Sequence, residues 1–182
     1  MMRDFSMHFM DIVQNSIKAD AKNIIIKLNE NVHENLFEFS VSDDGKGMTD
    51  EQAKKAISPF FTSRTTRKVG LGLPLLNQTC MTCNGKMSLE STPGVGTTVT
   101  ATMEYDHIDR PPLGNVGETL FILIITNMEI DFKYIHNYNS NKYILDTKEI
   151  KEVLEGVPLN SPDVMSWLRA NIKEGLEEIR HG

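Results

Sequence analysis

Residues 36–43, LFEFSVSD, constrain the fold of this chain more than any other segment. Phe37, Phe39 and Val41 alternate with polar residues, a pattern that predicts a strand with one buried face. The same alternation turns Asp43 inward at the end of the strand. An inward carboxylate is costly unless it has a partner. The sequence therefore predicts a polar pocket with Asp43 at its floor.

The six residues DDGKGM, which begin at Asp43, indicate what such a pocket binds. A carboxylate accepts a hydrogen bond from an exocyclic amine, and glycines at 45 and 47 let the backbone pass close to a flat ring. Adenine has both features. Taken alone, however, the motif is more typical of an ordinary Asp-Gly hairpin turn, so other segments must decide between these two interpretations.

A predicted helix over residues 4–20 carries a narrow polar stripe. His8, Asp11, Asn15 and Lys18 follow one another at spacings of 3, 4 and 3 residues, which stacks their side chains along one line. The Asn15 amide oxygen is a suitable ligand for the magnesium ion that accompanies a triphosphate. The other side of this helix is expected to be buried: Phe5, Phe9, Ile12, Val13, Ser16 and Ile17.

Two further glycine-rich segments favour a nucleotide. Gly70 and Gly72 precede a predicted helix over residues 73–84, and a helix N-terminus attracts an anion. A second glycine turn contains Gly94, Gly96 and Thr97, between predicted strands over 86–91 and 97–105. A strand over 22–29 and a short helix over 49–57, opened by a capping box of Thr49 and Gln52, complete this half of the chain.

These motifs, in their order and spacing, resemble the N, G1, F, G2 and G3 boxes of the GHKL superfamily, which includes gyrase B, the large heat-shock chaperones, histidine kinases and mismatch-repair ATPases. The resemblance covers about residues 4–105. The matching segments are DIVQNSIKADA, DDGKG, SPFFTSR, GLGLPLL and ESTPGVGTTV. The resemblance implies an α+β fold of the Bergerat type, a two-layer sandwich of a mixed sheet with helices on one face.

The resemblance also implies ATP and Mg²⁺ as cofactors and assigns roles to residues. Asp43 contacts the adenine amine, Asn15 holds the metal, and Lys18 lies near the phosphates. The glycines of the boxes line the nucleotide. The backbone amides of residues 70–72, just before the predicted helix over 73–84, reach the phosphates. The expected nucleotide contacts of these boxes are Gly45, Gly47, Gly70, Leu71, Gly72 and Thr97.

The stretch SPFFTSRTTRKVGLGLPL, residues 58–75, concentrates cationic side chains in an acidic chain. Basic residues with aromatics are typical of nucleic-acid binding, but a net charge of −6 argues against it. We expect residues 62–68 to form a lid over the triphosphate, with Arg64, Arg67 and Lys68 as phosphate contacts. A lid this short leaves the γ-phosphate open to a second protein.

Asp11 departs from the superfamily pattern. Hydrolysing members have a glutamate at this position as general base for water, and aspartate is shorter by one methylene, roughly 1.5 Å. Reach to the attacking water decides whether such a base works. Asp11 is therefore a candidate catalytic residue, or a residue that only orients His8 or Lys18.

The segment DHIDRPPLGNVG, residues 106–117, divides the chain. We expect an ATP-binding domain over residues 1–106 and a C-terminal extension over 107–182 with a hairpin and helices. Residues 117–127 form either a buried strand or the tail of a helix. The extension resembles tails of small standalone ATP-binding proteins of anaerobic bacteria, some encoded beside hydrogenase subunits, which implies a partner linked to redox or hydrogenase systems.

Three functions remain open at this stage. The first is Mg-dependent phosphotransfer to a histidine or serine of a separate protein, the second a slow ATP-hydrolysing switch, and the third a non-catalytic ATP sensor. The apolar runs are too short to span a membrane and the N-terminus lacks a signal-peptide core. We therefore expect a cytoplasmic protein that binds neither membrane nor nucleic acid.

Overall fold

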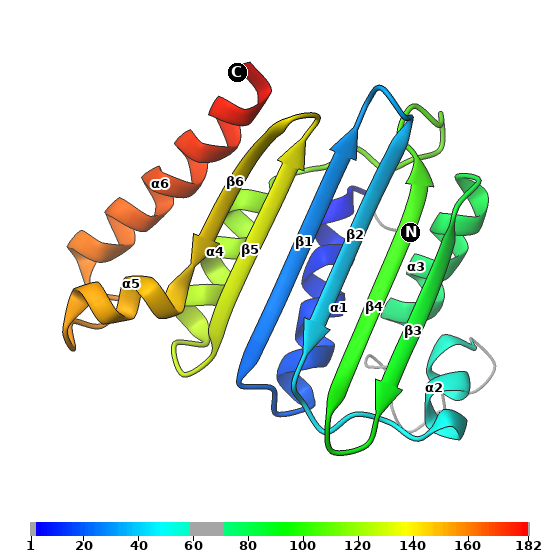
Figure 1. Ribbon diagram of the computed structural model, residues 1–182, viewed down its shortest axis with the longest axis horizontal. Helices are drawn as coiled ribbons and strands as arrows, with labels where there is room; N and C mark the ends of the chain where they lie inside the picture. Colours follow the sequence, from blue (N-terminus) through cyan, green and yellow to red (C-terminus); the bar gives the residue numbers. More distant parts are fainter. Residues whose placement is uncertain (1–2, 59–70, 182) are drawn as a thin grey trace.

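The computed structural model describes residues 3–58 and 71–181. The described residues form one six-stranded mixed sheet in the order β3-β4-β2-β1-β5-β6 (Figure 1). Among the neighbouring strand pairs of this sheet, only β1 and β5 run parallel to each other. The elements are α1 (Phe5–Lys18), β1 (Asn23–Asn31), β2 (Leu36–Asp43), α2 (Asp50–Ile57), α3 (Gly72–Thr82), β3 (Lys86–Thr92), β4 (Gly96–Glu104), α4 (Val116–Thr126), β5 (Asp131–Tyr138), β6 (Asn141–Asp146), α5 (Thr147–Leu154) and α6 (Pro162–His181).

Helices cover one face of this sheet. Figure 1 shows α3, α1 and α4 behind the strands, and α6 packs against α4 and the β5–β6 edge. Ile24, Ile26 and Leu28 of β1 point into the core, whereas the residues between them face the open side. The fold is therefore the α+β two-layer sandwich that the sequence predicts.

The predicted elements of the first half are present. The Thr49–Gln52 capping box opens α2, with both reciprocal hydrogen bonds formed. Gly85 follows the end of α3 for a reason that the sequence does not reveal. A Cβ at this position would lie 1.7 Å from the carbonyl oxygen of Thr102, so only glycine lets the chain pass this close to β4.

Residues 117–126 of the segment for which strand and helix were both open belong to the helix α4, and Asn127 is its C-cap. Asn115 caps it by accepting a hydrogen bond from the Glu118 amide. Leu120, Phe121 and Ile124 are buried because α4 packs between α1 and α6. A helix covered on several sides is apolar around much of its circumference, so its sequence lacks a clear amphipathic period.

The C-terminal half completes the same sheet. Strand β5 pairs with β1 in parallel register, from Asn23 opposite Asp131 to Glu30 opposite Tyr138, and β6 pairs with β5. Core residues of α4 and β5 pack with those of α1 and β2 in one apolar cluster. The segments on either side of the predicted division at residue 106 thus share one sheet and one core.

Candidate functional site

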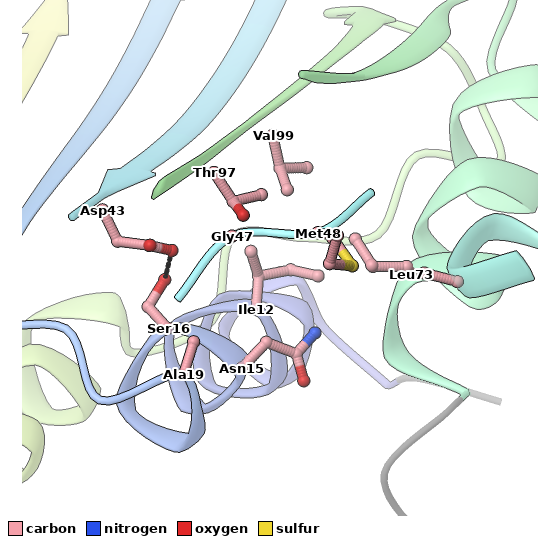
Figure 2. A pocket seen from close by; sticks show the side chains of 11 residues that line it. Ile12, Asn15, Ser16, Ala19, Asp43, Gly47, Met48, Leu73, Thr97 and Val99 are labelled. Atoms are coloured by element: carbon pink, nitrogen blue, oxygen red, sulfur yellow. Dashed lines mark hydrogen bonds between the residues drawn. The ribbon is translucent and has the colours of Figure 1, made fainter. Parts of the chain in front are cut away.

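A pocket of about 210 Å³ lies between α1, the glycine turn after β2, and the start of β4 (Figure 2). Leu73 of α3 and Ala56 of α2 close its side. The sequence brings these segments together because β2 pairs with β4 and α1 crosses beneath their ends. The lining residues are Ile12, Asn15, Ser16, Ala19, Asp43, Gly47, Met48, Ala56, Leu73, Thr97 and Val99.

Asp43 lies in this pocket with both carboxylate oxygens anchored. The Ser16 hydroxyl donates to Oδ2 at 2.6 Å, and the Gly45 amide donates to Oδ1 at 2.8 Å. A carboxylate oxygen accepts more than one hydrogen bond. The carboxylate is therefore held in a fixed orientation and can still accept from a ligand in the pocket.

Ser16 is a site residue that sequence reasoning missed, because its spacing places it among the apolar residues of α1. It is buried, at 3% exposure, and its hydroxyl reaches the Asp43 carboxylate only because α1 faces the end of β2. One signal was present: a hydroxyl on an apolar helix face needs a partner when it is buried.

Two glycines allow the close approach of the turn after β2. A Cβ at Gly45 would lie 2.7 Å from the carbonyl oxygen of Ala19, and one at Gly47 would lie 2.0 Å from that of Thr92. Gly47 also has a φ of +69°, a backbone conformation that residues with a Cβ rarely adopt. Gly47 lines the pocket, whereas Gly45 contributes to it through the hydrogen bond that its amide donates to Asp43.

Thr97 contributes a second polar group to the pocket. Its hydroxyl lies 2.7 Å from that of Ser91, which accepts from the Met48 amide and donates to the Gly96 carbonyl. Because Ser91 has a single hydroxyl proton, Thr97 is the donor of the pair. The Thr97 oxygen therefore keeps its acceptor capacity.

The polar stripe of α1 extends from the pocket toward the N-terminus of α3. Asn15 lines the pocket, and Figure 2 shows its amide directed away from Asp43. Asp11 lies against Gly72, where a Cβ would be 3.2 Å from that of Asp11. Burial raises the pKa of Asp11, and the charge of Lys18 opposes this shift.

Neither Asp11 nor Lys18 belongs to the pocket lining. His8 is buried at the other end of the stripe, where its Nε2 lies 3.2 Å from the Thr79 hydroxyl of α3. No hydrogen bond of the described chain joins Asp11 to His8 or Lys18.

Part of the predicted phosphate site lies outside the described residues: Gly70, Arg64, Arg67 and Lys68. Leu71 and Gly72 are described and form the start of α3, with Leu71 at the N-cap position. Leu71 is exposed and does not line the pocket, which α3 reaches through Leu73 instead.

The residues present fit a magnesium ion bound together with a nucleotide. Mg²⁺ keeps several waters and takes one or two protein oxygens beside those of a phosphate, and Asn15 offers one amide oxygen at the pocket. Within residues 3–58 and 71–181 no group of three or more His, Cys, Asp or Glu side chains is arranged to hold a metal by itself. A metal here would therefore depend on the nucleotide.

Comparison with known proteins identifies the family. A model described as histidine kinase-, DNA gyrase B- and HSP90-like ATPase matches residues 4–107, more than half of the chain. The chain belongs to this family. The family is the one that the five boxes resemble, and the match ends just after β4.

Among curated proteins, relatives of this chain include kinases. Sporulation kinase C of Bacillus subtilis is 30% identical over 88 residues, which are 48% of this chain and 20% of that protein. The histidine protein kinase SaeS of Staphylococcus aureus is 28% identical over 100 residues, 51% of this chain and 28% of that protein. The chain thus spans less than a third of the length of either kinase.

Two solved structures share the fold of this chain. The N-terminal domain of a DNA repair protein aligns over 80% of this chain and 53% of its own, with a TM-score of 0.54 and 17% identity. The Aquifex aeolicus MutL ATPase domain, solved in complex with ADP, aligns over 85% of this chain and 70% of its own, with a TM-score of 0.50 and 16% identity.

No helix in the described part of the chain has the length and apolar character to cross a membrane.

Proposed function

We propose that this protein binds ATP with Mg²⁺ and transfers the γ-phosphate to a separate protein. The observation that carries the proposal is Asp43, a carboxylate held at the pocket floor by Ser16 and the Gly45 amide. Its remaining lone pairs match the exocyclic amine of adenine, whereas the carbonyl oxygen of guanine would be repelled.

The rest of the pocket suits a flat heteroaromatic ring. Ile12, Leu73 and Val99 supply apolar surface, and burial of such surface favours binding. The acceptor oxygen of Thr97 offers a second point of recognition beside Asp43. Gly47 lets the backbone lie against the ring, where any side chain would require the turn to move.

We place the triphosphate between the α1 stripe and the start of α3. Asn15 would hold the metal, which neutralises phosphate charge, and Lys18 adds a positive charge one turn away. The N-terminus of α3 favours an anion, as the N-terminus of any helix does. Arg64, Arg67 and Lys68 complete the proposed phosphate contacts. Phosphoryl transfer depends mainly on positioning and charge neutralisation, and these groups provide both.

The acceptor is a histidine or serine of a partner protein in this proposal. The two kinases among the relatives support transfer over simple binding. The proposal includes a cytoplasmic location, a signalling or regulatory role, a partner linked to redox or hydrogenase systems, and no binding to nucleic acid or membranes.

Asp11 favours hydrolysis as a second candidate function. Its carboxyl lies at the N-terminus of α3, and burial raises its pKa, which makes it a better proton acceptor than an exposed carboxylate. A switch that hydrolyses ATP slowly needs this base, whereas transfer to a protein side chain does not.

One assay with ATP labelled at the γ-phosphate separates these functions. Label on an added partner supports transfer. Free phosphate that disappears in Asp11→Asn but persists in the exposed control Asp20→Asn supports hydrolysis. Tight ATP binding without either product supports a nucleotide sensor. Absence of ATP binding to the folded protein would overturn the proposal.

A further inference from the structure

A second cleft of about 730 Å³ shares no lining residue with the nucleotide pocket. Its walls are the outer side of α3, the start of α1 and the connection over residues 108–112. Leu75 and Ile108 provide apolar surface, and Ile108 is 94% exposed. The volume is in the range of small-molecule sites.

His8 lines this cleft with an unsatisfied imidazole nitrogen. The residue is 1% exposed, and no described residue forms a hydrogen bond with its Nδ1. Buried polar atoms almost always have a partner, so His8 Nδ1 is expected to bind an ordered water or a ligand. Burial lowers the pKa of His8 to about 4, which makes its imidazole neutral at pH 7.

The hydrogen bonds of Thr79 determine where the His8 proton lies. The Thr79 hydroxyl donates to the Leu75 carbonyl at 3.0 Å, so it accepts from His8 Nε2. His8 Nδ1 is then unprotonated in the free protein. A ligand that accepts a hydrogen bond from Nδ1 requires the other tautomer, in which Thr79 donates to Nε2.

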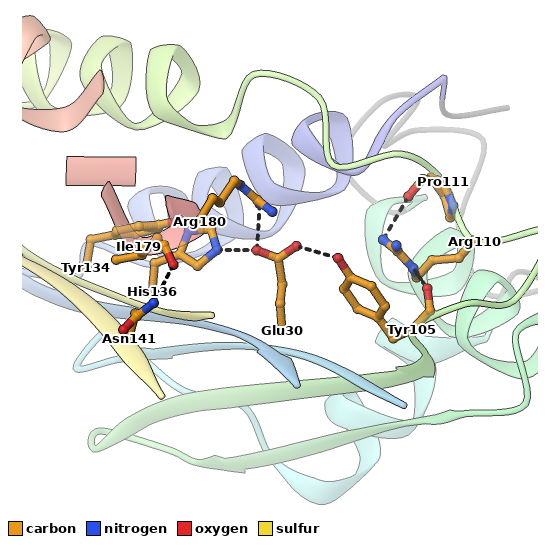
Figure 3. A network of polar contacts seen from close by, with 9 residues as sticks. All are labelled: Glu30, Tyr105, Arg110, Pro111, Tyr134, His136, Asn141, Ile179 and Arg180. Atoms are coloured by element: carbon orange, nitrogen blue, oxygen red, sulfur yellow. Dashed lines mark hydrogen bonds and ion pairs between the residues drawn. The ribbon is translucent and has the colours of Figure 1, made fainter. Parts of the chain in front are cut away.

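Arg110 lines the same cleft with a guanidinium that lacks a carboxylate partner among the described residues. It donates to the carbonyl oxygens of Tyr105 and Pro111 and packs 4.6 Å from the Tyr105 ring centroid (Figure 3). These neutral acceptors orient the guanidinium and leave its charge uncompensated. A half-buried arginine held in this way is suited to pair with an acid.

The charges around the cleft favour an anion. Arg3 and Arg110 are positive, the Asp109 carboxylate at the exposed rim is negative, and His8 is neutral. The cleft is thus net positive in a chain whose net charge is −6. Thr82 and Gln78 add hydroxyl and amide donors.

We propose that this cleft binds a small organic anion, with its acid group between Arg3 and Arg110 and in contact with His8, and its apolar part on Leu75 and Ile108. The acid is a carboxylate or a phosphate monoester. His8 and Thr79 belong to α1 and α3, which also line the nucleotide pocket, but the proposed anion site does not depend on the proposed ATP binding.

The experiment uses the full chain labelled with ¹⁵N-histidine and three probes that share one ring: benzoate, phenyl phosphate and uncharged benzamide. We expect one or both acids to shift the His8 Nδ1 resonance saturably toward the protonated type, and benzamide to leave it unchanged. An equal response to benzamide, or no His8 response to any probe at tens of millimolar, overturns the proposal.

Variants identify the charges involved. Arg3→Gln changes an exposed side chain and should weaken acid binding several-fold without affecting folding, and Arg110→Gln should weaken it at least tenfold. Lys142→Gln, an exposed cation of β6, is the matched control and should bind normally. Unchanged binding in Arg3→Gln and Arg110→Gln contradicts the site.

A repeat with saturating ADP separates the two pockets. The His8 response to the acid should persist, and its loss would place the anion in the nucleotide pocket and overturn the proposal. Failure of ADP to bind would contradict the proposed function instead, because the titrations without nucleotide still report on the cleft.

Discussion

Asp43 and Asp44 are neighbours in the chain, yet their carboxylates have different environments. Asp43 binds Ser16 and the Gly45 amide at the pocket floor. Asp44 accepts from the Lys22 and Asn23 amides at 2.8 and 2.9 Å and fastens the turn before β1. The same residue type thus serves recognition at one position and loop structure at the next.

Asp43→Asn should therefore lose ATP affinity while the protein stays folded. A hydrogen bond to a charged group contributes about 1.5–3 kcal/mol, so we expect a loss of about 10- to 100-fold, measured by calorimetric titration. Asp44→Asn is the control: it should keep its ATP affinity and lose about 1–2 kcal/mol of unfolding free energy. Unchanged affinity in Asp43→Asn would contradict the proposed adenine contact.

His8 should make the stability of the protein depend on pH. Burial lowers its pKa from 6.5 to about 4, so between these values the unfolded chain binds a proton that the folded protein does not. Stability present above pH 6.5 is therefore lost as the pH falls, by about 2–3 kcal/mol at pH 4.5.

Urea unfolding at several pH values tests this expectation. His8→Gln should flatten the pH dependence between 6.5 and 4.5, whereas His33→Gln, in the exposed turn before β2, should keep the slope of the wild type. Equal slopes in the wild type and His8→Gln would show that His8 does not cause the effect.

At the scale of elements, the glycine turns after β2 and after β3 form a single unit. The Gly94 amide donates to the Lys46 carbonyl at 2.7 Å, and Gly47 passes close to the Thr92 carbonyl. This contact sets the position of the turn that lines the pocket. The two glycines both have positive φ but differ in the space around them.

Gly47→Ala and Gly94→Ala therefore form a matched pair. Both place a Cβ on a left-handed backbone, at a cost of about 1–2 kcal/mol. Gly94 has open space, so its variant should lose only this amount and bind ATP normally. In Gly47→Ala the Cβ would lie 2.0 Å from the Thr92 oxygen, so the turn must move, with a further loss of stability and at least tenfold weaker ATP binding.

Denaturant unfolding and nucleotide titration of both variants measure these losses. Equal effects of the two substitutions on ATP affinity would show that backbone conformation alone, and not the contact between the turns, positions the pocket.

At the scale of the whole molecule, a buried polar network joins the C-terminal helix to the sheet (Figure 3). Glu30 of β1 accepts from His136 of β5 at 2.6 Å and from Arg180 of α6 at 2.7 Å. Burial raises the pKa of Glu30, but the hydrogen bonds and charges of His136 and Arg180 outweigh it, so the net shift is downward. The network therefore connects segments that lie 150 residues apart in the chain.

Glu30→Gln should detach the end of α6. Removing one member of a buried ion pair leaves its partners uncompensated, and because Arg180 is only half-buried we expect a loss of about 2–4 kcal/mol. Hydrogen exchange should become faster in the last turn of α6. Glu38→Gln, on the open face of β2, is the control with little effect, and protection of α6 unchanged in Glu30→Gln would contradict the role of the network.

Much of the site followed from the sequence because its signals are local. The alternation of β2 turns Asp43 inward, the 3-and-4 spacing of α1 aligns Asp11 with Asn15, and glycine marks turns with positive φ. Each of these depends on residues a few positions apart. The family resemblance rests on the same local segments, and the family match confirms it.

Tertiary structure decided what depends on distant partners. Ser16 joined the site only because α1 faces the end of β2, and α4 is a helix because it fills the space between α1 and α6. Likewise β5 lies beside β1, about 110 residues earlier in the chain, and builds both halves into one sheet. The sequence alone determined which residues form the pocket floor and its turns, since strand and turn chemistry is local. Only the tertiary structure decided which distant residues hold that floor in place, since those contacts join segments that no short-range pattern connects.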